Sequence, residues 1–420
     1  MNKYLPRLVE QKVQLQMKAA GCVVIEGPKW CGKSTTAKRF AKTIVELQNP
    51  DVFRLYQTFA NTNGKMLFEN EKPIMFDEWQ KIPELWDYIR HAVDNSEKRG
   101  QYILTGSAKP LEDPLRHSGA GRFAKIIMRP MSLWESGDST GEVSLEKLFN
   151  DEHNISGQAK FKLDGIAHVI CRGGWPETIN KDKETSLQLA ENYFQLLTDS
   201  DITNVDDIKR NPERTKKILR SYARHISSLA ANKTIQDDIS ASDPIDDKTL
   251  TSYTNALRKL FVIEDVLPWN PRLRSKTTMR AANKRQFVDP AIAAAALGAS
   301  PDDLFNDINT FGFLFESLCT RDLRIYAETM GGTVSHYRDN KGLETDTIVH
   351  LRNGDWGAVE IKLGGNQIDE AAKNLLKLKN RVDTAYMKEP KFLMVLSGLD
   401  YAYRRHEDGV LVVPIGCLKP

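Results

Sequence analysis

Eight consecutive residues near the N-terminus have the types and spacing that bind nucleotide phosphates. They follow the pattern GxxxxGK[ST] and are Gly27, Pro28, Lys29, Trp30, Cys31, Gly32, Lys33 and Ser34. In such a loop the backbone N–H groups wrap the phosphates, Lys33 reaches the β- and γ-phosphates, and the Ser34 hydroxyl ligates Mg²⁺. The loop therefore predicts a site for ATP and Mg²⁺, which the next residue, Thr35, also lines.

Two acidic residues, Asp77 and Glu78, directly follow the apolar run at residues 73–76. An apolar strand that ends in Asp-Glu is the Walker B pattern. Asp77 is expected to hold Mg²⁺, mostly through water, and Glu78 to polarise the water that attacks the γ-phosphate. The alternative is an ordinary acidic turn after a strand.

Two further segments are placed to complete this nucleotide site. The apolar run at residues 101–104 ends in Thr105 and Ser107, and functional groups in parallel sheets gather where the strands end. Either hydroxyl is therefore a candidate sensor of the γ-phosphate, with a helix cap or turn as the alternative. Arg122 follows a glycine-rich turn and is a candidate catalytic arginine, for this site or a neighbouring subunit's, unless it is a solvated loop residue.

Near the C-terminus, Asp346 opens one predicted strand, and Glu360 and Lys362 end the next. Residues two apart on a strand share a face, so Glu360 and Lys362 point the same way. A hairpin between the strands would place the Asp346 and Glu360 carboxylates side by side. Two carboxylates that share one site need a cation, or one of them must be protonated. This predicts a divalent-metal site, since Mg²⁺ favours oxygen ligands.

This arrangement resembles the PD-(D/E)xK nucleases. The resemblance implies that Asp346 and Glu360 bind Mg²⁺, that Lys362 orients or activates the attacking water, and that Glu316 on the preceding helix is an additional acidic metal ligand. It implies a catalytic role for Asp346, Glu360 and Lys362 in cutting nucleic acid. The alternative is a scaffold that keeps the fold without cleavage.

The elements around the N-terminal motifs are typical of an α/β protein. Apolar strands are predicted at residues 22–26, 73–76 and 101–104, and a helix at 34–42, directly after the glycine-rich loop. The context of strand, loop and helix is the one that the phosphate-binding motif requires.

A wider resemblance rests on the motifs GPKWCGKST, IMFDEWQ, ILTGSA, GAGRFAKIIMRPMSLWE and RGGWPE. Together they resemble the prokaryotic AAA-type ATPases that carry a C-terminal domain of unknown function with a nuclease-like fold. Arg122 and the segment at residues 172–177 match motifs of that family. The resemblance implies a P-loop AAA-type core at residues 1–130, followed by a helical lid at 131–205.

Residues 206–300 are predicted to form a winged-helix-like domain. Helices are expected at 213–230, 234–239 and 247–257, with wing strands at 261–266 and 286–288. Six basic residues lie between the wing strands: Arg272, Arg274, Lys276, Arg280, Lys284 and Arg285. Such a wing, with polar residues of the last helix, suits phosphate and groove contacts. The alternative is a winged helix used for protein packing, because several acidic neighbours would repel DNA.

Residues 301–420 are predicted to form the α/β nuclease-like domain. The expected elements are a helix at 311–330, strands at 333–338, 345–351 and 357–363, a helix at 369–381 and a strand at 392–396. The polypeptide has 420 residues, 40% of them hydrophobic and 27% charged, and a net charge of +3. It contains no apolar run near the ~18 residues of a membrane span and no signal peptide, so a cytoplasmic protein is expected.

The best functional hypothesis from the sequence is an ATP hydrolase that controls a nucleic-acid-directed, possibly nuclease, module. DNA is the favoured nucleic acid, and protein partners or a homo-oligomer also fit. The competing hypothesis is an ATP-dependent regulatory or scaffolding switch with a non-catalytic nuclease-like fold. A kinase-like phosphotransferase fits less well, because Glu78 follows Asp77 and no second substrate motif is evident.

Overall fold

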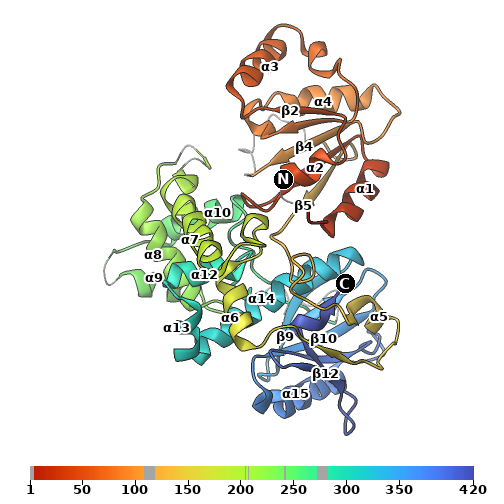
Figure 1. Ribbon diagram of the computed structural model, residues 1–420, viewed down its shortest axis with the longest axis vertical. Coiled ribbons are helices and arrows are strands. Elements are labelled where there is room, and N and C mark those ends of the chain that lie inside the picture. The colour runs from red at the N-terminus through yellow and green to blue at the C-terminus, as the bar shows by residue number, and fades with distance from the viewer. Residues whose placement is uncertain (1–3, 108–118, 204, 207, 241–242, 272–281) are drawn as a thin grey trace. The chain divides into compact units, whose positions relative to one another are not determined.

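The computed structural model describes residues 4–107, 119–203, 205–206, 208–240, 243–271 and 282–420. The chain forms two compact units (Figure 1). The N-terminal unit comprises Met1–Pro130, Asn204–Asp207 and Lys259–Phe261. The C-terminal unit comprises Met131–Thr203, Ile208–Arg258 and Val262–Pro420. The chain thus passes from the first unit to the second after Pro130.

The N-terminal unit is built on a sheet of five parallel strands in the order β2-β3-β4-β1-β5. The strands are β1 (Cys22–Glu26), β2 (Thr43–Glu46), β3 (Ile74–Asp77), β4 (Tyr102–Gly106) and β5 (Phe123–Ile127). The helices are α1 (Val9–Ala19), α2 (Lys33–Lys38), α3 (Pro50–Thr62) and α4 (Leu85–Asp94). All three predicted strands are present. The helix predicted at 34–42 is observed as α2, which is shorter than predicted because it ends at Lys38.

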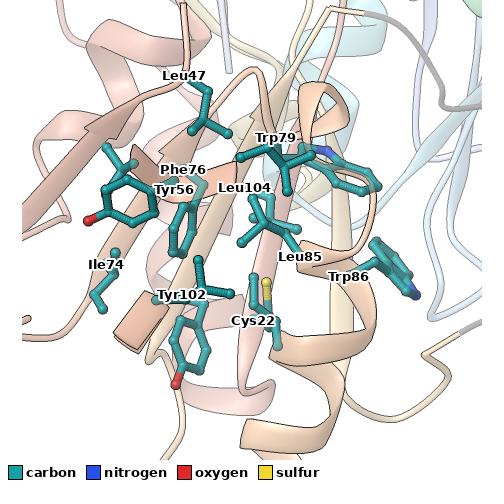
Figure 2. Close-up of a cluster of buried hydrophobic side chains, with 14 of the residues drawn as sticks. Cys22, Leu47, Tyr56, Ile74, Phe76, Trp79, Leu85, Trp86, Tyr102 and Leu104 are labelled. Carbon is teal, nitrogen blue, oxygen red and sulfur yellow. The ribbon is translucent and has the colours of Figure 1, made fainter. Parts of the chain in front are cut away.

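The three central strands of this sheet are buried along their whole length. Parallel sheets are covered on both faces, which explains why these strands read as continuous apolar runs. One core cluster (Figure 2) combines Phe76 and Leu104 from the sheet with the ring of Trp79. The Trp86 ring of α4 stacks on Phe123 of β5 with centroids 4.0 Å apart. This packing holds the carboxyl ends of β1, β3 and β4 in a fixed arrangement.

The C-terminal unit combines a helical group with a mixed sheet (Figure 1). Its helices are α5 (Leu145–Phe149), α6 (Leu163–Arg172), α7 (Lys183–Asp199), α8 (Pro212–Arg224), α9 (Asn232–Ser240), α10 (Asp247–Lys259), α12 (Pro290–Leu297), α13 (Pro301–Asn306), α14 (Ile308–Thr329) and α15 (Ile368–Arg381). Its strands are β6 (Val143–Ser144), β7 (Gly157–Gln158), β8 (Thr333–Arg338), β9 (Glu344–His350), β10 (Trp356–Lys362), β11 (Leu393–Ser397), β12 (Tyr401–Arg404), β13 (Leu411–Pro414) and β14 (Leu418–Lys419).

The main sheet of this unit has seven strands in the order β7-β12-β13-β11-β10-β9-β8. Strands β10, β11 and β13 run parallel, and the outer pairs are antiparallel. The helix–strand order from α14 to β11 is the predicted one, with bounds that differ by at most three residues. Helix α15 is amphipathic and buries its apolar side against β10 and β11.

The sequence predicts a helical lid over residues 131–205, but before α6 begins at Leu163 this region contains only the five-residue helix α5. Residues 131–162 carry two strands of two residues each, which pair with β14 and β12 near the C-terminus. The left-handed Gly137 and Gly141 favour turns over helix here. The predicted boundary near residue 300 falls inside the C-terminal unit, because α12 packs on α6, α7, α8 and α14.

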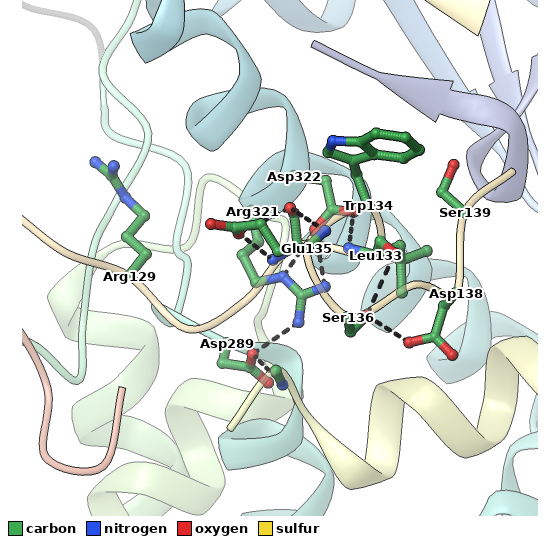
Figure 3. Close-up of polar contacts among 12 residues, drawn as sticks. Arg129, Leu133, Trp134, Glu135, Ser136, Asp138, Ser139, Asp289, Arg321 and Asp322 are labelled. Carbon is green, nitrogen blue, oxygen red and sulfur yellow. Dashed lines mark hydrogen bonds and ion pairs between the residues drawn. The ribbon is translucent and has the colours of Figure 1, made fainter. Parts of the chain in front are cut away.

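A buried ion network joins four segments of the C-terminal unit (Figure 3). Arg321 of α14 is 2% exposed and contacts both Asp289 and Asp322 at 2.8 Å. Asp289 caps α12 and accepts a hydrogen bond from Gly174 N at 3.0 Å. Asp322 accepts one from Leu133 N at 2.9 Å. The guanidinium therefore holds together the segment after residue 130, the end of α6, the start of α12, and α14.

We expect Arg321→Met to destabilise the C-terminal unit by about 3–5 kcal/mol, because it leaves two buried carboxylates without their cation. The matched control is Arg338→Met, which removes an exposed ion pair with Glu344 and should cost about 1 kcal/mol or less. Calorimetric unfolding of both variants measures the difference. Equal effects of the two changes would contradict the role given to Arg321.

Candidate functional site

The glycine-rich loop lies between β1 and α2 in the N-terminal unit, as the motif requires. Its first residue, Gly27, has a φ of 154°, and a Cβ there would lie 2.1 Å from the Met128 carbonyl oxygen. Its last glycine, Gly32, caps α2 with a left-handed φ of 98°. Both positions therefore require glycine. At Gly27 the loop backbone lies directly against the Met128 carbonyl group, which follows β5, with no room for a side chain between them.

Some side chains of the loop are buried against the protein, and others are exposed to solvent. Lys33 is 6% exposed, and its ammonium donates a hydrogen bond to the Pro28 carbonyl oxygen at 2.7 Å. Cys31 is buried, with its thiol 3.3 Å from Met128 O. Lys29, Trp30 and Thr35 are exposed. Lys33 thus lies across its own loop, where a phosphate could take over the hydrogen bond that Pro28 now accepts.

The Asp77 carboxylate at the end of β3 contacts one residue of helix α2 and one residue of strand β4. Its Oδ1 accepts hydrogen bonds from Ser34 Oγ at 2.7 Å and from Thr105 Oγ1 at 2.6 Å. Ser34 and Asp77 thus bring a hydroxyl and a carboxylate oxygen together, beside the loop that carries Lys33. Hard cations such as Mg²⁺ take this kind of oxygen set and keep several waters. The residues fit Mg²⁺, and Ser34 and Asp77 are the ones that would hold it.

Glu78 has a left-handed backbone, with φ 54° and ψ 47°. A residue other than glycine pays about 1–3 kcal/mol in such a conformation, and such strain gathers at functional sites. Its Oε2 accepts hydrogen bonds from Gln80 and, at 3.3 Å, from Ser107 Oγ. The two predicted sensor hydroxyls therefore have separate partners in this structure, since Thr105 contacts Asp77 and Ser107 contacts Glu78.

Arg122 lies on the surface of the N-terminal unit. Its Nε donates to the Asp94 carboxylate at the end of α4, at 2.6 Å, and its side chain is 45% exposed. The hydrogen bond from Arg122 lowers the pKa of Asp94. The structure thus gives Arg122 a surface partner, and its role at a nucleotide stays a prediction.

Arg7, which no sequence pattern singles out, lies against the phosphate-binding loop. It is 6% exposed, and its guanidinium donates to the Cys31 carbonyl oxygen at 2.5 Å and to the Arg129 carbonyl oxygen at 2.7 Å. Arg7 therefore links the phosphate-binding loop to the chain that follows β5. No motif marks this arginine, because the groups through which it links the two segments are backbone carbonyls.

The predicted C-terminal residues also come together, in the C-terminal unit. Lys362 Nζ contacts Asp346 Oδ2 at 3.0 Å and Glu360 Oε2 at 2.8 Å, which places these two carboxylates side by side. A second lysine, Lys284, contacts Glu316 Oε1 at 2.7 Å and Asp346 Oδ1 at 3.5 Å. We call Lys284, Glu316, Asp346, Glu360 and Lys362 the acidic cluster.

The acidic cluster is buried, and this changes the ionisation of its members. Burial raises the pKa of Glu316 to about 7. Burial and the neighbouring Asp346 raise the pKa of Glu360 to about 8. Burial also acts upward on Asp346, but the charges of Lys284 and Lys362 outweigh it and lower its pKa to about 2. Protons and lysine side chains together therefore neutralise the three carboxyl groups.

These residues do not fit the predicted metal site. The sequence predicts Mg²⁺ on Glu316, Asp346 and Glu360, but at least one oxygen of each carboxyl group contacts an ammonium group instead. In the part of the chain that the structure describes, no group of three or more His, Cys, Asp or Glu residues is arranged to hold a metal ion. Lys284, one of the six basic residues predicted to lie in a wing, supplies one of these ammonium groups.

The predicted basic wing is described only in part. Arg272, Arg274, Lys276 and Arg280 lie outside the described residues. The two predicted wing segments pair through the bridges Ile263↔Phe287 and Val266↔Lys284. Lys284 and Arg285 are buried, and Arg285 donates to Ala230 O and Asn232 Oδ1. These two basic residues thus serve internal contacts, and contact with nucleic-acid phosphates is not open to them in this structure.

Three parts of the chain match known families. Residues 20–136 match a family described as an AAA domain. Residues 163–303 match a domain of unknown function, DUF8612, and residues 311–418 match another, DUF4143. The P-loop, Asp77, Glu78, Thr105, Ser107 and Arg122 all lie within residues 20–136, the part that matches the AAA domain.

Two similar proteins are Mb2031c of Mycobacterium bovis and Rv2008c of Mycobacterium tuberculosis, both uncharacterized. Each is 22% identical to this chain over 354 residues, which is 82% of this chain and 70% of the relative. Among solved structures, the Walker-type ATPase PABY2304 of Pyrococcus abyssi aligns with a TM-score of 0.41 and 14% identity, over 70% of this chain and 96% of that one. Within the described residues, no helix is both long and apolar enough to cross a membrane.

We expect Thr105→Val to lower the affinity for ATP with Mg²⁺ by about 2–10-fold, because it removes one hydrogen bond, worth about 0.5–1.5 kcal/mol, from the carboxylate of Asp77. Affinity for ATP in EDTA should change less. Titration calorimetry with and without Mg²⁺ measures both values. The matched control is Thr62→Val on the exposed face of α3, and an equal effect there would contradict the role of Thr105.

Proposed function

We propose that this chain is an ATPase that binds ATP with Mg²⁺ at the P-loop and hydrolyses it with Glu78 as the general base. The observation that carries the proposal is the 2.7 Å contact between Ser34 and Asp77, next to the loop whose Lys33 lies across it. The match of residues 20–136 to an AAA domain supports it.

Each residue has a distinct task in this proposal. Lys33 exchanges its hydrogen bond with Pro28 for the terminal phosphates. Ser34 and Asp77 would hold Mg²⁺, which would supply positive charge to neutralise the phosphates. Glu78 accepts a proton from the attacking water, while Ser107 orients its carboxylate by the 3.3 Å hydrogen bond. Thr105 is a positioning residue, since it acts through Asp77.

We further propose that nucleotide binding is transmitted toward the C-terminal unit through residues 128–130. The phosphate-binding loop touches this segment at several points, namely the close approach of Gly27 to Met128 O, the Cys31 thiol, and the Arg7 bridge to Arg129 O. If the loop changes its conformation when it binds phosphates, these contacts move residues 128–130 with it. Switches commonly act through such hinge segments.

For the C-terminal unit we propose the regulatory or scaffolding role over nuclease action. The observation that favours it is Lys284, whose ammonium contacts the carboxylates that a nuclease metal would need. Nucleic-acid binding by the unit, with DNA favoured, stays a proposal that rests on the sequence. It does not require the acidic cluster to be catalytic.

We expect Lys33→Ala to abolish tight ATP binding, because it removes the charge that the loop aims at the terminal phosphates. Glu78→Gln should retain ATP binding within a few-fold and reduce turnover by about 100-fold or more, as loss of a general base does. Fluorescent-nucleotide titration and phosphate release measure the two effects. Turnover of Glu78→Gln at the wild-type rate would show that another residue is the base.

Incubation of the full chain with plasmid, single-stranded DNA and RNA tests the C-terminal role, with and without ATP and with Mg²⁺ or Mn²⁺. We expect ATP hydrolysis without cleavage. Cutting that disappears on Asp346→Ala would overturn the scaffolding role and leave the ATPase assignment untouched. A salt-dependent mobility shift without cutting would support a nucleic-acid scaffold.

A further inference from the structure

Lys284 has an unusual position for a lysine, since its side chain is 10% exposed and ends among carboxylates. Its ammonium is 2.7 Å from Glu316 Oε1, 3.5 Å from Asp346 Oδ1 and 3.5 Å from the Asp346 carbonyl oxygen. These three oxygens come from α14 and β9, which are distant in sequence from Lys284. Buried lysines are rare unless they are paired, and these three oxygens are the partners of this ammonium.

The backbone of Lys284 is held as firmly as its side chain. Its N–H donates to Val266 O, and its carbonyl oxygen accepts from Val266 N, both at 2.9 Å. This antiparallel bridge directs the side chain of Lys284 into the acidic cluster. The ammonium is therefore a fixed part of the fold and not the mobile end of a surface side chain.

The two lysines divide the central carboxylate between them. Lys284 contacts Oδ1 of Asp346, whereas Lys362 contacts Oδ2 and also Glu360. A divalent cation with bonds of about 2.1 Å to Glu316 and Asp346 would need the space that the Lys284 ammonium fills. Metal and ammonium are therefore mutually exclusive at this place.

We propose that Lys284 is a built-in cation that takes the place of a divalent metal in the acidic cluster. With Lys284 in place, the cluster needs no metal to keep its carboxylates together. Without Lys284, the same oxygens of Glu316 and Asp346 become available to a metal. The Lys284 ammonium thus occupies the position of a metal ion in the acidic cluster. The negative charge of the carboxylates is then balanced whether or not divalent metal is present in solution.

The test is Mn²⁺ binding to the full chain without nucleotide, measured by calorimetry and by the loss of the free Mn²⁺ electron-spin signal. Lys284→Met, which removes the charge and keeps the length, should bind Mn²⁺ at least about tenfold more tightly than the wild type. The double change Lys284→Met with Asp346→Asn should lose this gain. Lys388→Met, which removes an exposed lysine paired with Asp355, is the matched control and should resemble the wild type.

Two outcomes would overturn the proposal. One is a folded Lys284→Met protein, by circular dichroism, that gains no Mn²⁺ affinity. The other is read in the wild type itself and so does not depend on the variant folding: a rise in melting temperature with millimolar Mn²⁺ that Asp346→Asn abolishes would show that metal binds despite Lys284. Neither outcome bears on ATP binding at Lys33, which is measured separately.

Discussion

The C-terminal unit depends on one interaction above the others, the burial of the Arg321 guanidinium between Asp289 and Asp322. Burying three charges is costly, and the cost is offset only when each lone pair and N–H finds a partner. Here Asp289 Oδ2 accepts a hydrogen bond from Gly174 N as well as from Arg321. Asp322 accepts one from Leu133 N on Oδ2, the oxygen that does not face Arg321. The glycine-rich turn after α6 and the segment after residue 130 are thus set by the same ion. Two motifs far apart in sequence, RPMSLWE and RGGWPE, are thereby brought to the same buried ion.

Two acidic sites in this chain show how the choice of neighbour decides the chemistry. Asp77 is surrounded by the hydroxyls of Ser34 and Thr105, which can rotate and share an oxygen with an incoming cation. Asp346 is surrounded by two ammonium groups, which already supply the positive charge. The surroundings of Asp77 would accept Mg²⁺, because hydroxyl groups bring no charge. At Asp346 the two ammonium groups already balance the negative charge of the carboxylate.

The sequence predicts those parts of the structure that local pattern determines. The strands around the P-loop and the elements from α14 to β11 were predictable, because each is a continuous apolar or alternating run with clear turn signals. The two-residue strands β6 and β7 were not, because their conformation comes from partners at β14 and β12 and not from their own residues. The prediction that Lys284 lies in a solvated basic wing is wrong for a similar reason. Its partner Asp346 is 62 residues away, and a run of basic residues reads as a solvated surface.

The pairing of β6 with β14 also has a consequence for the order of events during synthesis. Ser139 donates to Leu418 O across 279 residues of chain, so the segment after residue 130 meets its partner only when residues near 418 have left the ribosome. At about 5–20 residues per second this delay is on the order of tens of seconds. The strands of the N-terminal sheet all lie within the first 127 residues and need no such wait. Translation therefore separates the two sheets in time, and a nascent chain can complete the sheet that carries the P-loop before the C-terminal sheet has all its strands.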